Sequence, residues 1–213
     1  RFTNFYPDTR VMNVLSFSYS QMAEDNEGRI WIGGLFDVII FDPGTQKFLS
    51  SGWFDFAKNA GNIQFEKRNS ITHSIVKKSE NELWMLTVYG LFSVDTRTLQ
   101  YTYYSNPEID DYFAYYLSHI DKNGVLWIST FDHCFYTFDS HSNIWTHHKC
   151  PEKNKNYPDQ MAVIQPYRDE GLLMLRMDDV FLYKPENKTF KRFKFIEDEK
   201  SLNSATNVNL AVF

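Results

Sequence analysis

Acidic residues in the connections are the first candidates for chemistry in this chain. Asp110-Asp111 and Asp178-Asp179 are doublets, and Asp132 is a further isolated carboxylate. A pair of carboxylates on either side of a glycosidic bond can act as general acid and as base or nucleophile. The ordinary role of such residues is a solvated loop carboxylate, and the sequence does not give the separation of any pair. We therefore assign no catalytic residue.

Aromatic residues beside polar ones are the second candidates. Stacking on a sugar ring needs an exposed aromatic face next to carboxylates, amides or other hydrogen-bonding groups. The alternative role for each aromatic side chain is hydrophobic packing of the linkers. The candidate ligand-binding set is Trp53, Tyr89, Tyr112, Phe131, His133 and Asp178.

Metal and cofactor chemistry finds no support in the sequence. His147 and His148 are adjacent on an expected strand, so their side chains should point to opposite faces and cannot form a paired metal ligand. The chain has no glycine-rich phosphate loop, no nucleophile elbow and no Cys/His spacing of a metal site. We predict no metal, no cofactor and no catalytic site.

One sequence pattern recurs four times and must position these candidates. Trp31, Trp84 and Trp127 each stand at the front of a short apolar run, and Leu173 takes that place in a more degenerate copy. The intervals are 53, 43 and 46 residues, close to the length of one four-stranded propeller blade. A closing aromatic follows at a fixed offset, with one extra residue in the third copy. The closing aromatics are Phe48, Tyr101, Trp145 and Phe190.

Each copy predicts four short strands. The segments GRIWIGG from Gly28 and GVLWIST from Gly124 are short, apolar and rich in β-formers, and both follow a polar turn. A second apolar run, a tight turn and a strand with the closing aromatic come next, and one candidate strand precedes each tryptophan column. The predicted blades span roughly 10–52, 68–105, 112–150 and 160–196, and 207–213 is the first strand of a further blade.

These units predict an all-β fold, a β-propeller built of four-stranded antiparallel blades. A lone sheet of this kind cannot bury both faces, whereas radial stacking of similar sheets buries them and protects the sheet edges. We expect the tryptophan-column residues and the closing aromatics to be buried between blades. About four blades and a partial one would not close a ring, so we expect the chain to be part of a longer propeller.

One segment has competing helical spacing. Ile109, Tyr112, Phe113, Tyr116, Leu117 and Ile120 recur with helix-like intervals, but 112–120 occupies the innermost-strand position of the third copy, which predicts a strand. The segment 53–61 could hold a turn or two of helix, and the sequence does not decide this point.

The repeat resembles the two-component regulator propeller repeat, which occurs in tandem in the sensor regions of hybrid two-component systems of Bacteroidetes-type bacteria. The second copy lacks the Asp-Gly turn of that pattern and the fourth lacks its tryptophan. The third copy matches best, through Asp121, Gly124, Leu126, Trp127, Ile128, Ser129 and Thr130. The first copy keeps Asp25, Gly28, Trp31, Ile32, Gly33, Phe41, Asp42, Thr45 and Phe48.

The resemblance implies a function. The chain would be the periplasmic ligand-sensing propeller of a membrane-anchored hybrid sensor, recognising a glycan fragment and passing a conformational signal to a cytoplasmic histidine kinase outside this chain. Implied partners are an oligosaccharide, neighbouring blades and signalling domains of the same polypeptide, and a second copy in a parent homodimer. The alternative is a propeller-fold lyase or glycoside hydrolase with Asp178, Asp179 or Asp132 as acid or base.

Composition and cysteines add two expectations. The formal net charge is −5, and the chain has no basic stripe, so we expect no nucleic-acid partner. No apolar stretch is long enough to span a bilayer. The two cysteines, Cys134 and Cys150, flank an expected hairpin, where they could form a disulfide in an oxidising periplasm or remain two free thiols.

Overall fold

The computed structural model describes residues 4, 22–34, 38–53, 56, 72–108, 115–130, 134–149, 163–168, 170–176 and 179–193 of the chain. These residues form four antiparallel sheets of four strands each, so the fold is all-β as predicted. In every sheet the strands follow chain order from one edge to the other. We number the sheets as blades 1 to 4. None of the described helical segments is long and apolar enough to cross a membrane.

Every blade is a simple four-stranded meander. Blade 1 comprises β1 (Met22–Glu24), β2 (Ile30–Gly33), β3 (Val38–Asp42) and β4 (Lys47–Ser50). Blade 2 comprises β5 (Thr72–Lys77), β6 (Glu82–Thr87), β7 (Gly90–Asp95) and β8 (Tyr101–Tyr104). Blade 3 comprises β9 (Tyr115–Ile120), β10 (Leu126–Thr130), β11 (Phe135–Asp139) and β12 (Ile144–His148). Blade 4 comprises β13 (Val163–Tyr167), β14 (Gly171–Arg176), β15 (Asp179–Lys184) and β16 (Thr189–Phe193).

These sheets lie within the ranges expected from the repeats, and β9 forms a strand in the segment with competing helical spacing. The candidate strand at 207–213 lies outside the described residues. A helical hydrogen bond from the Phe56 amide to the Gly52 carbonyl marks a turn of helix at the start of 53–61.

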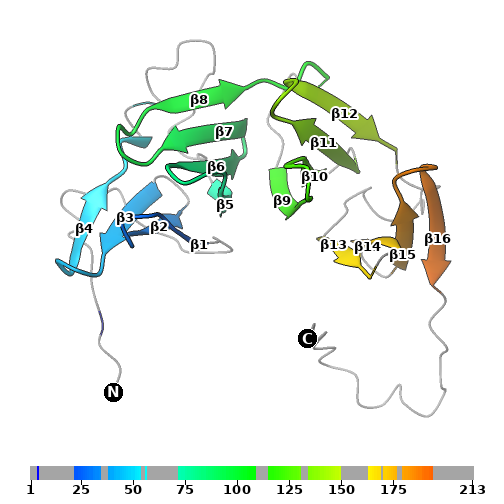
Figure 1. Ribbon diagram of the computed structural model, residues 1–213, viewed down its shortest axis with the longest axis horizontal. Coiled ribbons are helices and arrows are strands. Elements are labelled where there is room, and N and C mark those ends of the chain that lie inside the picture. Colours follow the sequence, from blue (N-terminus) through cyan, green and yellow to red (C-terminus); the bar gives the residue numbers. More distant parts are fainter. Residues whose placement is uncertain are drawn as a thin grey trace.

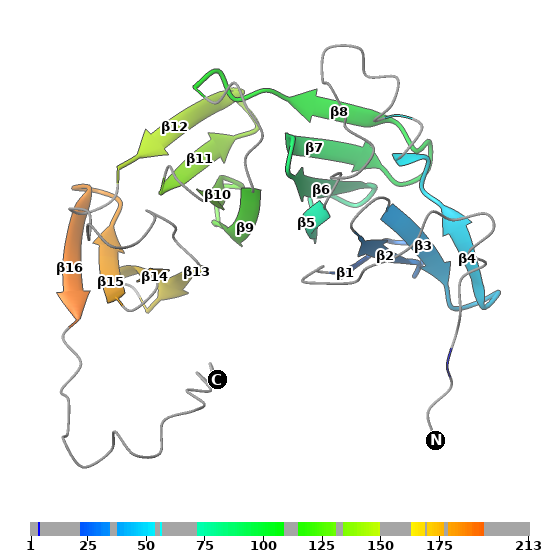
Figure 2. The same ribbon diagram turned by 180° about the vertical axis from the view of Figure 1, so that it is seen from behind.

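The blades are arranged as an open arc (Figures 1 and 2). The first strands β1, β5, β9 and β13 lie on the inner side of the arc, and the last strands β4, β8, β12 and β16 form its outer side. Successive blades touch through their inner strands, since β5 contacts β1 and β2, β9 contacts β5 and β6, and β13 contacts β9 and β10. Blades 1 and 4 stand at opposite ends of the arc (Figure 1).

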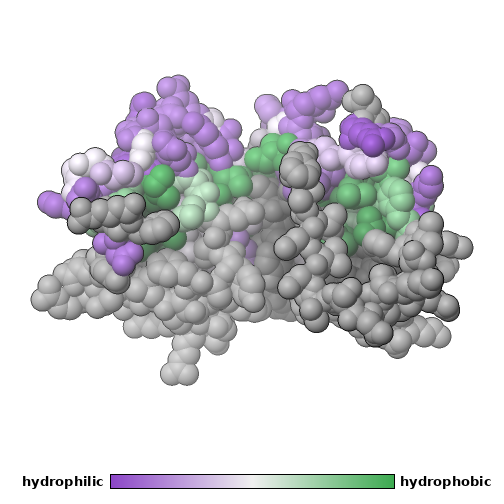
Figure 3. Space-filling view, turned by 90° about the horizontal axis from the view of Figure 1, so that it is seen from below, coloured by the Kyte–Doolittle hydropathy of each residue, from purple (hydrophilic) through white to green (hydrophobic). Residues whose placement is uncertain are grey.

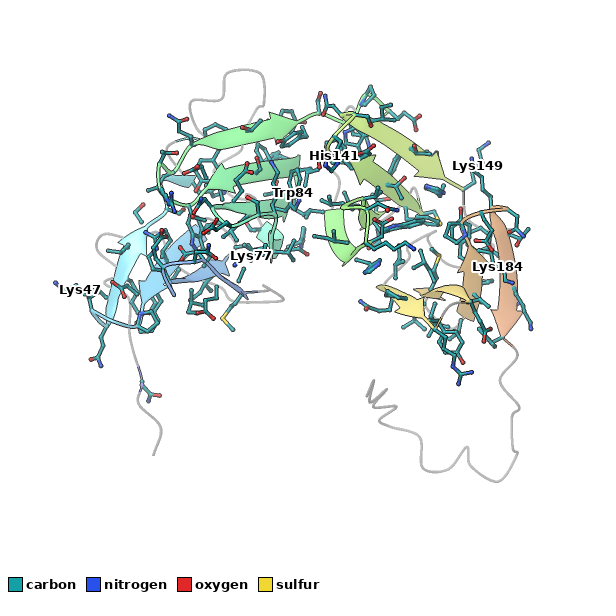
Figure 4. All side chains as sticks on the ribbon, viewed as in Figure 1. Lys47, Lys77, Trp84, His141, Lys149 and Lys184 are labelled. Atoms are coloured by element: carbon teal, nitrogen blue, oxygen red, sulfur yellow. The ribbon has the colours of Figure 1, made fainter. Side chains whose placement is uncertain are left out.

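The apolar core lies between successive blades. Trp31 is 0%, Trp84 2% and Trp127 6% exposed, so the burial predicted for the tryptophan column is confirmed in blades 1 to 3. Each ring belongs to a different cluster, at the junction of its own blade with the next one. Figure 4 shows Trp84 inside the arc, whereas Lys47 and Lys184 lie toward its outer side.

Two parts of the burial prediction are wrong. Leu173 is half-buried, because it lies on the face of blade 4 that points away from blade 3. The closing aromatics are also only half-buried, because they lie on the outermost strand of each blade. They still pack across the hairpin, with ring centroids 5.0 Å apart for Phe41–Phe48 and 4.6 Å apart for Tyr183–Phe190.

The turn between the third and fourth strands is built in the same way in every blade. The residue two positions before the closing aromatic has a left-handed backbone in each of the four, with φ between 55° and 57° at Gln46, Leu99, Asn143 and Lys188. In blades 1 to 3 an aspartate at the end of the third strand accepts hydrogen bonds inside the turn, as Asp42 does from Thr45 Oγ1 at 2.7 Å. These bonds lower the pKa of Asp42, Asp95 and Asp139.

Cys134 is disulfide-bonded, and Cys150 is the only other cysteine in the sequence. Of the two alternatives left open by the sequence, two free thiols are therefore excluded, and Cys150 itself lies outside the described residues.

Candidate functional site

One rim of the arc carries the connections in which the candidate ligand-binding residues were predicted. In a four-stranded meander, the connections between the second and third strands and the linkers between blades emerge on the same side. We call this side the loop rim, defined by the ends of β2, β6, β10 and β14 and the starts of β3, β7, β11 and β15. The opposite side carries the tight turns, and we call it the turn rim. Hydrophilic residues gather along one edge of the arc in the side view of Figure 3.

Two of the six predicted binding residues can be placed. Trp53 and Tyr89 are described, and both belong to the cluster between blades 1 and 2. Tyr112, Phe131, His133 and Asp178 lie outside the described residues. Their role in binding stays a prediction.

Trp53 fills the junction between blades 1 and 2. It is 0% exposed, and its ring lies edge-on to Phe92, with centroids 4.9 Å apart. Tyr101 packs against the same ring at 5.2 Å, and the Tyr101 hydroxyl donates a hydrogen bond of 2.9 Å to the Ser51 carbonyl. Trp53 therefore has the packing role stated as the alternative to ligand stacking, and a sugar could reach its ring only after a rearrangement of the linker.

Tyr89 is held at the tip of the β6–β7 connection. Its backbone amide donates a 3.0 Å hydrogen bond to Thr87 Oγ1, and that hydroxyl donates a 3.3 Å bond to the Gly90 carbonyl. Thr87 is fully buried, which fixes the hydroxyl in place. Gly90 has φ 126°, and a Cβ there would lie 3.1 Å from the Tyr103 ring. The connection thus has one defined shape, with a half-buried tyrosine at its tip.

Buried polar groups on β5 lie beside this connection. Thr72 pairs with Thr87 across the sheet, and its amide donates a 3.1 Å hydrogen bond to the Gly34 carbonyl of blade 1. The Thr72 hydroxyl is buried and has no hydrogen-bond partner. Burial lowers the pKa of the adjacent His73 to about 4, so this imidazole is neutral at neutral pH. The junction between blades 1 and 2 therefore contains a buried, uncharged hydroxyl, that of Thr72, close to the connection that carries Tyr89.

A carboxylate of the repeat motif has a structural role at the same junction. Asp25 is 4% exposed and accepts hydrogen bonds of 2.8 Å from Trp31 Nε1 and from Arg29 Nε. Arg29 also donates a 2.8 Å bond to the Thr96 carbonyl of blade 2. The network fixes the ring orientation of Trp31 and ties the first turn of blade 1 to the last turn of blade 2.

Blade 2 replaces this aspartate with a lysine. Lys78 stands six residues before Trp84, as Asp25 stands six residues before Trp31. Its ammonium group lies 4.5 Å from the centroid of the Trp84 ring and 2.9 Å from Glu82 Oε1. A cation over the face of the indole is attracted by the ring quadrupole. The loss of the Asp-Gly turn in the second copy is therefore compensated by a different contact with the same column.

The two adjacent histidines point to opposite faces of blade 3, as predicted. His147 stacks on Tyr136 on the side of blade 2, with centroids 4.7 Å apart. His148 points to blade 4, where its Nδ1 lies 2.9 Å from the Tyr183 hydroxyl and its Nε2 lies 3.0 Å from Thr137 Oγ1. Burial, with Lys188 and His147 nearby, lowers the pKa of His148 to about 4. The sequence indicated the opposite faces but gave no sign of the bond to Tyr183.

The described residues contain no group of three or more metal-ligating side chains. Of the carboxylates named as possible acid or base, Asp132 and Asp178 lie outside the described residues, and Asp179 opens β15 with a side chain that is not described. The alternative of an enzyme therefore has no described catalytic geometry.

No protein-family model matches this chain, and no curated protein matches it either. Solved structures do resemble it. The extracellular domain of the candidate hybrid two-component system BT3049 from B. thetaiotaomicron matches with a TM-score of 0.63 and 18% identity, over 84% of this chain and 25% of that one. That of BT4673, a second candidate hybrid system from the same organism, matches with a TM-score of 0.59 and 19% identity, over 84% of this chain and 22% of that one.

An auxiliary nutrient binding protein from Bacteroides thetaiotaomicron is a more distant match, with a TM-score of 0.52 and 8% identity over 81% of this chain and 40% of that one. This chain spans less than half the length of each of these structures. At such low identity the likeness concerns the fold. The chain shares with these proteins an all-β, propeller-like fold of four-stranded antiparallel blades.

Proposed function

We propose that this chain is a ligand-sensing propeller segment from the periplasmic region of a membrane-anchored hybrid two-component sensor. The observation that supports the proposal is the combination of four sequence repeats that resemble the regulator-propeller repeat with a fold similar to that of two extracellular sensor-system domains. The disulfide-bonded Cys134 supports an oxidising compartment such as the periplasm. In this role the chain turns over no substrate, and the histidine kinase belongs to another part of the polypeptide.

The ligand proposed is an oligosaccharide bound at the loop rim. At the junction between blades 1 and 2, Tyr89 offers an aromatic ring on a fixed connection, and the uncharged side chains of Thr87 and Thr72 pair behind it on β6 and β5. A neutral sugar is recognised by stacking and by hydrogen bonds, whereas a charged ligand would need an opposite charge. The predicted residues Tyr112, Phe131, His133 and Asp178 would complete the binding surface.

Signalling would follow from a difference in affinity. A ligand shifts a two-state equilibrium only by the difference between its binding free energies for the two states. Each blade would move as a rigid unit, and the aromatic cluster and the Asp25–Arg29 network would couple the movement of blade 1 to that of blade 2. A glycan that contacts two blades would favour one of their arrangements and pass the change to the signalling domains.

The experiment is a panel of oligosaccharides screened by calorimetry against the complete extracellular region. We expect one class of glycan to bind with micromolar affinity, about −8 kcal/mol. Replacing Tyr89 by Ala should weaken binding about 2- to 13-fold, since an aromatic stacking contact contributes about 0.5–1.5 kcal/mol. Tyr167→Ala is the matched control, because this half-buried tyrosine ends β13 at the turn rim.

Two outcomes would contradict the proposal. If no glycan binds the complete region, the ligand class is wrong. If new reducing ends or unsaturated products accumulate when glycans are incubated with the protein, the chain belongs to the alternative class of lyases or glycoside hydrolases.

A further inference from the structure

The linkers that follow blades 1 and 2 begin in the same way but continue with different chemistry. Ser51 Oγ accepts a 3.2 Å hydrogen bond from the Trp53 amide, and Asn106 Oδ1 accepts a 3.1 Å bond from the Glu108 amide. Ser51 and Asn106 are both buried. The residue that follows each of these two caps is a tryptophan at the junction of blades 1 and 2 and a carboxylate at the junction of blades 2 and 3.

The blade that meets each linker differs in the same sense. Trp53 packs edge-on against Phe92, which pairs with Tyr103 across β7 and β8. Tyr136 and His147 hold the equivalent positions of blade 3, on β11 and β12. In the other three blades the position of Tyr136 is apolar and is occupied by Ile39, Phe92 and Phe181. The repeat therefore does not require a hydroxyl at this position.

The polar residues of the second junction contact one another, and we call them the second-junction cluster, comprising Asn106, Glu108, Tyr136 and His147. His147 Nδ1 lies 3.7 Å from Glu108 Oε2, and the His147 ring stacks on Tyr136 with centroids 4.7 Å apart. Burial and the nearby Glu108 carboxylate raise the pKa of Tyr136 to about 12, so its hydroxyl keeps its proton at neutral pH. The side chain of Glu108 is 56% exposed, so the cluster reaches solvent at the loop rim.

Two polar groups of the cluster make no hydrogen bond. Asn106 is 6% exposed, and its Nδ2 is buried without a partner in the described part of the chain. Tyr136 is 1% exposed, and none of the hydrogen bonds of the described residues involves its hydroxyl. Buried polar groups without a partner destabilise a protein, and native structures keep few of them. A ligand that supplies the missing partners would remove this penalty.

We propose that the second-junction cluster is a sugar subsite, one blade further along the loop rim than Tyr89. This inference rests on the proposed function, which supplies the oligosaccharide class of ligand. Glu108 accepts hydrogen bonds from sugar hydroxyls, and the Tyr136 hydroxyl and the Asn106 amide bind oxygens of the same sugar unit. The carboxylate would repel an anion, so the unit bound here is uncharged. Asn106 Nδ2 is covered in this structure, so the linker after β8 moves when the sugar binds.

The test uses two variants of the complete extracellular region, titrated with the glycan panel by calorimetry. Tyr136→Phe and Asn106→Ser bring in the residue types that the first junction has in Phe92 and Ser51, so packing and the cap of the linker are kept. Each variant should weaken glycan binding about 2- to 13-fold, the range expected for one neutral hydrogen bond.

Tyr183→Phe is the matched control. The Tyr183 hydroxyl lies 2.9 Å from His148 Nδ1 at the junction between blades 3 and 4, so its loss should leave glycan affinity unchanged. Without glycan, Tyr183→Phe should lower the melting temperature, because a hydrogen bond is lost. Tyr136→Phe should keep or raise it, because the hydroxyl has no partner to lose. Saturating glycan should raise the melting temperature of Tyr136→Phe less than that of the unmodified protein.

The outcomes separate this subsite from the proposed function. Unchanged affinity for either variant, or a lower melting temperature of Tyr136→Phe without glycan, would overturn the subsite. If Tyr89→Ala weakens binding and the two variants do not, the subsite alone is wrong. If no glycan in the panel binds, the subsite and the proposed ligand class are both wrong.

Discussion

Removal of the Asp25 carboxylate should be one of the most damaging single changes in blade 1. Asp25 is 4% exposed and accepts hydrogen bonds from the amides of Glu27 and Arg29, from Arg29 Nε and from Trp31 Nε1, at 2.8–3.0 Å. Asp25→Ala leaves the indole N–H of a fully buried tryptophan and the Nε–H of the half-buried Arg29 without their acceptor, while the Arg29 guanidinium keeps its bonds to Glu27 and to the Thr96 carbonyl. Breaking one side of a buried ion pair costs about 3–5 kcal/mol, and we expect a loss of that size.

Asp121 provides a matched control in the same column of blade 3. Its carboxylate accepts hydrogen bonds from the amides of Asn123 and Val125, but the indole nitrogen of Trp127 has no hydrogen-bond partner. Asp121→Ala should therefore cost only about 1–2 kcal/mol, the value of two hydrogen bonds in a half-exposed turn. The assay is urea denaturation followed by tryptophan fluorescence, with free energies of unfolding extrapolated to water. Equal losses for the two variants would refute the account of the Asp25 network.

Three further predictions concern the backbone and pH. Gly171→Ala should destabilise the chain by about 3 kcal/mol or more, because a Cβ there would lie 2.3 Å from the Tyr183 carbonyl oxygen. Gly52→Ala is the control, because this glycine also has a positive φ but no atom lies within 4 Å of the new Cβ. The melting temperature should therefore fall further for Gly171→Ala than for Gly52→Ala. Gln46→Gly should stabilise it by up to about 1 kcal/mol in the same urea assay, since glycine adopts the left-handed backbone (φ 57°) without a steric penalty; a loss of stability would contradict this. The folded-state pKa of His148 is about 4, below the usual 6.5, so the unfolded chain binds the proton more readily and stability should fall as pH drops from 6.5 to 4. His148→Gln should flatten that part of the stability curve, and an unchanged slope would contradict the assignment.

The fold could be predicted from the sequence because the same residue types recur at fixed offsets in each repeat, and because each repeat contains short apolar segments typical of β-strands. Trp31, Trp84 and Trp127 are buried at successive junctions because their offsets place them at the same point of each sheet. The strand at β9 formed despite helical spacing, because pairing with β10 supplies a whole row of backbone hydrogen bonds. Leu173 is the exception, and its exposure depends on what stands beyond blade 4, which column spacing cannot tell.

The left-handed residues of the turns between the third and fourth strands could not be predicted in the same way. Gln46, Leu99, Asn143 and Lys188 share a left-handed backbone, yet they are four different residue types, of which only asparagine favours that conformation. The turn geometry imposes it on the other three.

The place of Tyr89 in the meander could be predicted from the sequence, whereas its contacts could not, and a role in binding stays a prediction for the candidate residues. The loop rim follows from the meander, and Tyr89 lies there. Trp53 comes from a linker with no repeat counterpart, so nothing in the sequence distinguished an exposed stacking ring from a ring buried against Phe92 and Tyr101. The neutral state of His73 depends on the burial of its side chain, which sequence spacing does not show.

Hydrogen–deuterium exchange of the complete extracellular region, with and without the glycan found in the panel, tests the central claim most directly. The account predicts slower exchange with glycan bound at the amides of 87–90 and 72–74, at the loop rim between blades 1 and 2, and unchanged exchange in the turns at 43–46 and 96–99. Protection confined to the turn rim, or confined to parts of the region outside this chain, would contradict it.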